Sequence, residues 1–166
     1  MINVKEYTTI DRAAQGWPSG EWDGEPDKVQ WKDESTGMPC LAVRHGHSGH
    51  WCGYVGVNPD HPLFEKGYDE PSVEVHGGLT FADSCQKGET EAVGICHVPE
   101  PGESDHVWWF GFDCAHYMDS SPLDAKYDNE RRWHRDGVYR DLRYVQNQCA
   151  LLAGQLINYQ QQDSTP

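Results

Sequence analysis

The sequence contains few aliphatic residues and few basic ones. Leu, Ile, Val and Phe make up 28 of its 166 residues, about 17%, a fraction typical of disordered chains when the net charge is high. Thirteen Lys and Arg stand against 27 Asp and Glu, which gives a formal charge of −14. A phosphate backbone would repel such a chain, because proteins bind nucleic-acid polymers through Lys and Arg. The composition therefore excludes a polymeric nucleic-acid partner.

Long hydrophobic runs are missing as well. No stretch approaches the roughly 18 apolar residues needed to span a bilayer, so no membrane partner is expected. Residues 1–6 show no basic region followed by an apolar run, so no secretory signal is predicted and a cytoplasmic location is expected. In that compartment the six cysteines would be thiols or metal ligands more often than disulfides.

The cysteines contain no CxxC pair, so the strongest zinc signature is absent. Cys85, Cys96 and Cys114 lie near the candidate segments described below, and together they could form a thiolate site. A lone buried Cys behaves as a small apolar residue, which is the expected role of Cys40, Cys149 and Cys96.

Aromatic residues, in contrast, are abundant. The chain has 7 Trp, 8 Tyr and 4 Phe, each of which buries more surface than a Val, and disordered chains are poor in them. The sequence therefore predicts a single folded domain over residues 1–166. Residues 1–38 are rich in Gly, Pro and acidic residues and are predicted to be an irregular segment, docked through Trp17, Trp22 and Trp31.

Short runs of β-branched and aromatic residues predict a sheet region over residues 40–119. The predicted strands are 40–44, 51–57, 73–76, 93–98 and 107–113. Residues 99–105 suit a hairpin loop between the last two. With that pairing, His97 would face away from Asp113, so we expect His97 to be a packed residue rather than a ligand.

The clearest element comes last. Seven apolar side chains recur at spacings of three and four, which predicts a helix over residues 138–160 with Asp136 as its N-cap. This stripe is typical of a helix packed on a sheet, and equally of a homodimer interface. Strands followed by a helix predict an α+β fold, a mostly antiparallel sheet with one long C-terminal helix packed on it. The stripe consists of Val138, Leu142, Val145, Cys149, Leu152, Leu156 and Tyr159.

Two histidine-containing turns are candidates for chemistry. His45, His47 and His50 are spaced HxHxxH after a predicted strand, which is similar to the metal loop of metallo-β-lactamase-type hydrolases. That family has Asp just before the third His, whereas this chain has Gly49, and a plain His-rich hairpin loop is the favoured interpretation.

The second turn begins at His76, which ends a predicted strand and precedes Gly77 and Gly78. Glycines allow positive φ and close approach of the backbone to a ligand, and exposed amides in such a turn bind anions. His76 is therefore a candidate catalytic residue, and both glycines are candidate ligand-binding residues. A tight turn without a ligand is the alternative.

An aromatic strand leads into the best candidate site, formed by Asp113, His116 and Asp119. Residues spaced by three share one face if the chain turns helically there. Carboxylate and imidazole ligands suit Zn²⁺, Mn²⁺ or Fe²⁺, so the three are predicted metal ligands, with Asp113 and His116 also catalytic. The alternatives are an Asp cap with a packed His, a hydrogen-bonded core pair, or Cys114 as a nucleophile activated by His116.

Nearly half of the basic residues lie within residues 126–143, although the rest of the chain is strongly acidic. Arg side chains interleaved with aromatic ones suit a phosphorylated ligand that contains a base. The alternative is that they form salt bridges to the acidic body. The candidate ligand-binding residues here are Arg131, Arg132, Trp133 and Arg135.

The strings WCGYVGV, VEVHGGLTFADSC, GICHVPEPG and WWFGFDCAHYMD resemble a group of small proteins encoded by bacteriophages and related mobile elements. The resemblance covers about residues 25–119, with a further match near 139–152. It implies an accessory protein of the host bacterial cytosol. Phage proteins of this size include enzymes that destroy nucleotide immune signals, sponges that sequester them, and acidic mimics of DNA that inhibit host defence effectors.

These observations predict a protein that acts on a small anionic or nucleotide-like ligand. The first hypothesis is a metal-dependent hydrolase, in which the ion activates water against a phosphoester. The second is a non-catalytic sponge that binds a nucleotide second messenger in the same pocket. The third is an acidic nucleic-acid mimic, which leaves the His, Cys and aromatic clusters without a role.

Overall fold

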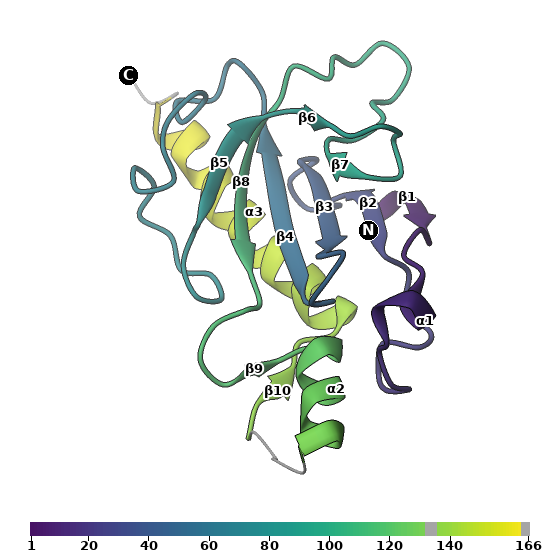
Figure 1. Ribbon diagram of the computed structural model, residues 1–166. Helices are drawn as coiled ribbons and strands as arrows, with labels where there is room; N and C mark the ends of the chain where they lie inside the picture. The colour runs from purple at the N-terminus through teal and green to yellow at the C-terminus, as the bar shows by residue number, and fades with distance from the viewer. Residues whose placement is uncertain (132–135, 164–166) are drawn as a thin grey trace.

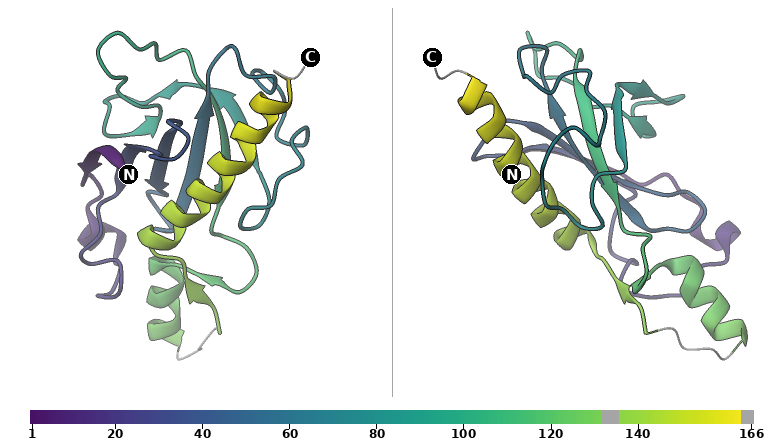
Figure 2. Two further views of the ribbon diagram at one scale, coloured as in Figure 1. Left: turned by 180° about the vertical axis from the view of Figure 1, so that it is seen from behind. Right: turned by 90° about the vertical axis from the view of Figure 1, so that its left-hand side faces the viewer.

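A six-stranded antiparallel sheet is covered on one face by a long helix in the computed structural model, which describes residues 1–131 and 136–163 (Figures 1 and 2). The sheet order is β1 (Ile2–Tyr7), β2 (Lys28–Lys32), β3 (Pro39–Arg44), β4 (Trp51–Val57), β8 (Trp108–Asp113) and β5 (Phe81–Ser84). Two short pairs are separate: antiparallel β6 (Gln86–Lys87) with β7 (Gly94–Ile95), and parallel β9 (Asp119–Ser120) with β10 (Val138–Tyr139). The helices are α1 (Arg12–Gln15), α2 (Pro122–Arg131) and α3 (Leu142–Asp163).

The predicted α+β class, with a mostly antiparallel sheet under a C-terminal helix, is confirmed. Figure 2 shows α3 running diagonally across the sheet. Its apolar stripe is core: Val145, Cys149, Leu152 and Leu156 are fully buried. Aromatic side chains supply much of the sheet's contribution to the core. They are Trp31, Trp51, Phe110 and Phe112 on the helix side, and Tyr54 and Trp109 on the opposite face.

Helix α3 begins at Leu142 and not at residue 138, so the predicted N-cap at Asp136 is wrong. Val138 is 51% exposed and belongs to β10, because that segment pairs with β9. Asp141 Oδ1 instead accepts the backbone N–H of Tyr144 at 2.8 Å, in the manner of an N-cap. The N–H of Leu142 donates to Glu25 Oε2 at 2.5 Å, which ties the helix to the N-terminal segment.

The N-terminal segment is less irregular than predicted, since it contributes β1 and β2 to the sheet. Buried ion pairs, as well as buried tryptophan side chains, hold this segment against the rest of the domain. Asp27, whose side chain is 1% exposed, contacts Arg12 Nη2 at 2.7 Å and Arg44 Nε at 3.3 Å. Arg44 is fully buried and also pairs with Glu25 at 3.3 Å. The strands that flank this network are therefore joined by buried ion pairs. Trp17, Trp22 and Trp31 are buried, as expected.

The predicted strands at 40–44, 51–57 and 107–113 are confirmed as β3, β4 and β8. The hairpin between 93–98 and 107–113 is wrong, because β8 pairs with β4 and β5, and only Gly94–Ile95 of the earlier run is a strand. His97 nevertheless packs, with its ring 5.4 Å from that of Trp109. Within the described residues, no helix combines the length and the apolar character needed to cross a membrane.

Candidate functional site

Two His–carboxylate pairs meet near the end of β8, beside the first turns of α3. His76 Nε2 lies 2.8 Å from Asp119 Oδ2, and His116 Nε2 lies 3.2 Å from Asp113 Oδ1. The two imidazole rings contact each other edge to face, with centroids 5.9 Å apart. The four residues singled out from the sequence therefore come together, but as two pairs.

Asp119 is the buried acid of the first pair, with a side chain only 2% exposed. It accepts hydrogen bonds from His76, from the backbone N–H of His116 at 3.0 Å and from Arg140 Nε at 3.1 Å. Burial by itself would raise the pKa of Asp119, but these donors outweigh burial and hold the pKa below its usual value. Asp119 is therefore ionised at neutral pH, orients the His76 ring and holds the backbone of His116.

Both ring nitrogens and the backbone N–H of His76 have hydrogen-bond partners. Its Nδ1 lies 2.8 Å from the Tyr144 hydroxyl, and its backbone N–H donates to Gln148 Oε1 at 2.9 Å. Because ionised Asp119 can only accept, Nε2 of His76 carries a proton. In the neutral ring Nδ1 then accepts a hydrogen bond from the Tyr144 O–H. The chain of contacts from Asp119 through His76 thus ends at a tyrosine hydroxyl.

His116 forms the second pair with Asp113. Asp113 also accepts the Thr80 hydroxyl at 3.0 Å and the Ala115 N–H at 3.1 Å, which fix its carboxylate. His116 Nε2 is buried against Gly77 and makes no hydrogen bond to any described residue, despite its close contact with Asp113. The His116 side chain as a whole remains 35% exposed. Part of its ring is therefore accessible to a ligand.

The segment that carries His76 is placed by helix α3 and not by the sheet. The strand predicted at 73–76 is wrong, because glutamine and tyrosine side chains of the helix, and not a neighbouring strand, satisfy its backbone amides. These helix residues lie four and seven positions apart and so share one face. The pairs are Ser72 with Tyr159, Glu74 with Gln155, and His76 with Gln148.

Asp113 ends β8, Asp119 begins β9 and His116 lies in the connection between them, so the three do not share one face of a helix and that part of the prediction is wrong. Met118 adopts a positive φ of 71°, which reverses the chain before β9. Parallel pairing of β9 with β10 then brings Arg140 beside Asp119. The two carboxylates consequently face different histidines.

The predicted metal ligands do not form a compact group of ligand atoms. Among the residues that the structure describes, one set of three or more such atoms lies within 4.8 Å of one another, and it consists of Cys85, Cys96 and Asp105. Both oxygens of Asp119 already accept hydrogen bonds, one of them from the cationic Arg140. Binding of Zn²⁺, Mn²⁺ or Fe²⁺ by Asp113, His116 and Asp119 stays a prediction, and it would require these contacts to rearrange.

The structure also places the other sequence candidates. Gly77 and Gly78 form the expected turn with φ of 68° and 78°, and Gly77 touches His116. Cys114 is buried, which raises the pKa of its thiol far above the usual value and disfavours a nucleophile. The side chains of Arg131, Arg132, Trp133 and Arg135 lie outside the described residues.

The HxHxxH loop is held by its own side chains. The rings of His45 and His50 stack with centroids 5.0 Å apart, and the Ser48 hydroxyl contacts both at 3.0 and 2.5 Å. Burial lowers the pKa of His50, and the neighbouring His45 adds to this effect. The hairpin-loop interpretation accounts for these contacts without a ligand.

Sequence reasoning missed Tyr144 and Gln148, and it did not assign Arg140 to the site. A signal was present, since Tyr144 and Gln148 are four residues apart on α3, next to the apolar stripe. Arg140 lies 4.9 Å above the Tyr144 ring and belongs to the basic segment. Tyr117, beside His116 in the chain, is 94% exposed and offers an accessible aromatic surface.

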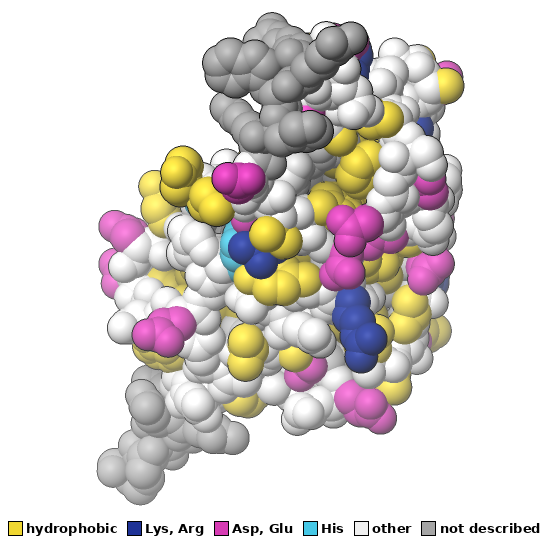
Figure 3. All heavy atoms as spheres, turned by 90° about the horizontal axis from the view of Figure 1, so that it is seen from below, with side chains coloured by type: hydrophobic (Ala, Val, Ile, Leu, Met, Phe, Trp, Pro, Cys, Tyr) yellow, Lys and Arg dark blue, Asp and Glu magenta, His cyan; other side chains and the backbone are white. Residues whose placement is uncertain are grey.

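Few of the side chains that the structure describes at this end of the molecule are basic. Figure 3 views the end that carries α2 and β9, where the described acidic side chains lie in separate groups between hydrophobic ones. Comparison of the chain with protein-family models, with curated proteins and with solved structures finds no match. The geometry of the site is therefore the guide to its function.

Proposed function

We propose that this chain is a phage-type accessory protein of the bacterial cytosol that hydrolyses a phosphoester in a small nucleotide-like ligand by general acid–base catalysis. The observation that carries the proposal is the contact of two His–carboxylate pairs, His76 with Asp119 and His116 with Asp113. Two imidazoles held by acids can supply one proton acceptor and one proton donor to the same phosphate. This arrangement favours acid–base chemistry over the metal-dependent route expected from spacing.

The roles follow from the hydrogen bonds. His116, part of whose ring is exposed, would remove a proton from the attacking water. As the water oxygen bonds to phosphorus, the leaving oxygen would receive the proton of the Tyr144 hydroxyl. This role requires the doubly protonated form of His76, stabilised by Asp119, in which Nδ1 donates to the Tyr144 oxygen instead of accepting from it and can return a proton to Tyr144. The Arg140 guanidinium would stabilise the charge that develops on the phosphate.

The remaining surface supports a ligand with an aromatic base. Tyr117 is almost fully exposed beside His116, and base–aromatic stacking contributes about 1–3 kcal/mol per base. A ligand held by Arg140, Tyr117 and the turn at Gly77 is expected to be small, because the net charge of −14 would repel a polymeric phosphate backbone.

Turnover is the measurement that tests the proposal. Purified protein is incubated with cyclic and linear dinucleotides, with and without a chelator, and the mixture is denatured and chromatographed. We expect a hydrolysed product that forms in the presence of chelator, and a loss of about 10²–10⁴-fold in rate for His116→Gln and for Tyr144→Phe. Tyr68→Phe, an exposed position elsewhere, is the matched control. Hydrolysis that stops with chelator would support metal catalysis and overturn this mechanism.

A sponge is the second candidate, and one observation favours it. Both ring nitrogens of His76 are already engaged in the ligand-free protein, and burial raises the pKa of Tyr144, which makes its hydroxyl a weaker proton donor. Recovery of intact dinucleotide from the denatured protein, with no product in any variant, would establish binding without turnover.

A further inference from the structure

A disulfide closes a hairpin on the face of the sheet opposite α3. Cys85, between β5 and β6, is bonded to Cys96, just after β7, with the two α-carbons 4.8 Å apart. This bond corrects the expectation that these two cysteines are thiols or packed apolar residues. The remaining cysteines, Cys40, Cys52, Cys114 and Cys149, are free.

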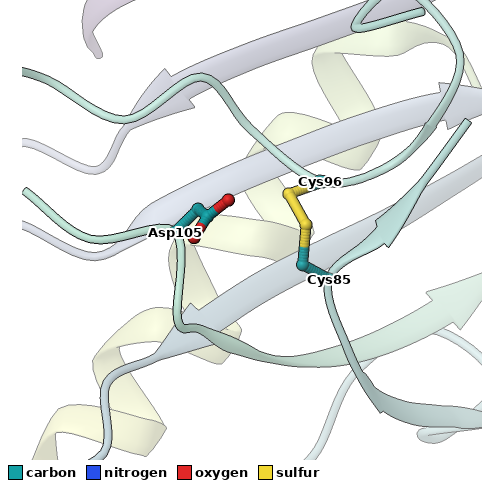
Figure 4. A group of neighbouring side chains, drawn as sticks. All are labelled: Cys85, Cys96 and Asp105. Carbon is teal, nitrogen blue, oxygen red and sulfur yellow. A yellow bond between two sulfur atoms is a disulfide. The ribbon is translucent and has the colours of Figure 1, made fainter.

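Asp105 approaches the same two sulfur atoms from the loop that leads into β8. Figure 4 shows its carboxylate extending toward the sulfur pair, and the three ligand atoms lie within 4.8 Å of one another. Asp105 also pairs with Lys87 at 2.8 Å, but both side chains are exposed and such a pair is weak. A carboxylate thus stands beside two sulfurs that come from different parts of the hairpin.

The surroundings can accommodate an ion and its charge. A cavity of about 320 Å³ adjoins the group, and Cys96, His97, Asp105 and Lys28 line it. Two thiolates and a carboxylate around a divalent cation leave one net negative charge, which Lys28 and Lys87 can balance. Lys28 is fixed in place, since its Nζ donates to the carbonyls of Glu91 and Cys96 at 2.8 and 2.9 Å.

We propose that reduction of the Cys85–Cys96 disulfide creates a Zn²⁺ site with Cys85, Cys96 and Asp105 as ligands. A dithiol reductant transfers two electrons to the disulfide and becomes a disulfide itself, which leaves two protein thiols. Zn²⁺ then replaces the two thiol protons, and water occupies the fourth position of a tetrahedral ion. The hairpin thereby exchanges a covalent crosslink for a metal crosslink between the same residues.

A reducing compartment makes this exchange relevant. Disulfides are rare where thiols are kept reduced, so a chain in the bacterial cytosol would hold this hairpin by the metal and not by the bond. The Zn²⁺ site rests on the cytosolic location of the proposed function but not on its hydrolase chemistry, because no residue of the His–carboxylate pairs belongs to this group.

Cobalt binding provides the test, because a Co²⁺–thiolate bond absorbs in the near ultraviolet and Zn²⁺ displaces it. The reduced full-length protein, freed of reductant without air, is titrated with Co²⁺ and then with Zn²⁺. We expect one Co²⁺ per chain, release of about two protons per ion, and no charge-transfer band in the oxidised protein. Cys85→Ser and Cys96→Ser should abolish the band, and Asp105→Asn should weaken affinity by more than about tenfold.

Cys52→Ser is the matched control, since it removes a thiol outside the group and should leave the band unchanged. Circular dichroism of the reduced wild type checks that it remains folded. The proposal is overturned if the folded, reduced protein gives no thiolate band, if the oxidised protein binds equally well, or if the band persists when both Cys85 and Cys96 are replaced.

Discussion

The imidazole of His116 lies directly against the α-carbon of Gly77, so that a β-carbon at residue 77 would overlap its ring. Gly77 has φ of 68°, a conformation that other residues adopt at a cost. Two independent constraints, backbone conformation and close contact, therefore require glycine here. Its neighbour Gly78 has φ of 78°, but a β-carbon there would meet no other atom within 4 Å, so Gly78 carries only the first constraint.

Replacing these glycines separates the two constraints. Gly78→Ala should lower the free energy of unfolding by about 1–2 kcal/mol through backbone strain alone. Gly77→Ala should cost more and should also displace His116, with a loss of turnover or ligand binding. Urea unfolding and the NMR signals of the His116 ring provide the measurements. Equal effects of the two substitutions on the His116 signals would contradict the contact.

The lowered pKa of Asp119 predicts a pH-dependent stability. Its folded-state pKa lies below the value of about 3.9 expected in the unfolded chain. The unfolded state therefore takes up a proton first as the pH falls, and the stability that Asp119 contributes is present above about pH 4 and lost below it. Asp119→Asn should remove this part of the acid sensitivity. Exposed Asp69→Asn should not, and urea unfolding from neutral to acidic pH compares the two.

The helix side chains that hold residues 72–76 can be tested one amide at a time. Gln148→Ala removes the acceptor for the His76 N–H, a hydrogen bond with a net contribution of about 0.5–1.5 kcal/mol. We expect the His76 amide to exchange with deuterium about 3–10-fold faster, with little change in global stability. Asn147→Ala, on the exposed side of α3, is the control. An unchanged exchange rate at His76 would show that Gln148 does not hold the segment.

The buried ion pairs of the N-terminal segment predict that a single isosteric substitution lowers the free energy of unfolding strongly. Asp27→Asn preserves shape but leaves Arg44, which is fully buried, without its full counter-charge. The free energy of unfolding should fall by about 3–5 kcal/mol, as is usual when one member of a buried pair is removed. Glu34→Gln, a 71% exposed partner of the N-terminus, should change little in the same urea titration. A comparable loss in both variants would refute a special role for the buried network.

Periodicity identifies the elements whose pattern is local. The stripe from Leu142 to Tyr159 repeats at the helical period, and the runs at 40–44 and 51–57 are short and rich in apolar residues between polar turns. The same grounds predict a strand at 73–76, yet its amides bond to Gln148 and Gln155 of α3. A partner more than 70 residues away leaves no trace in a local pattern.

In the candidate site, too, local sequence features were predictable and contacts between distant residues were not. Asp113, His116 and Asp119 are recognisable because they cluster in the sequence, and His76 because glycines follow it. Their pairing is not recognisable, since it depends on a turn at Met118 and on parallel pairing of β9 with β10. The Cys85–Cys96 bond likewise depends on how the β6–β7 hairpin folds, and spacing alone does not specify a partner.

The contribution of α3 to both core and site has a consequence for synthesis. A ribosome releases His76 and Asp119 well before the helix that carries Tyr144 and Gln148. Until that helix docks, the face of the sheet around Phe110 is uncovered, and His76 lacks its hydrogen-bond partners on the helix. The growing chain therefore acquires its site only after α3 has left the ribosome, in the same event that completes its hydrophobic core.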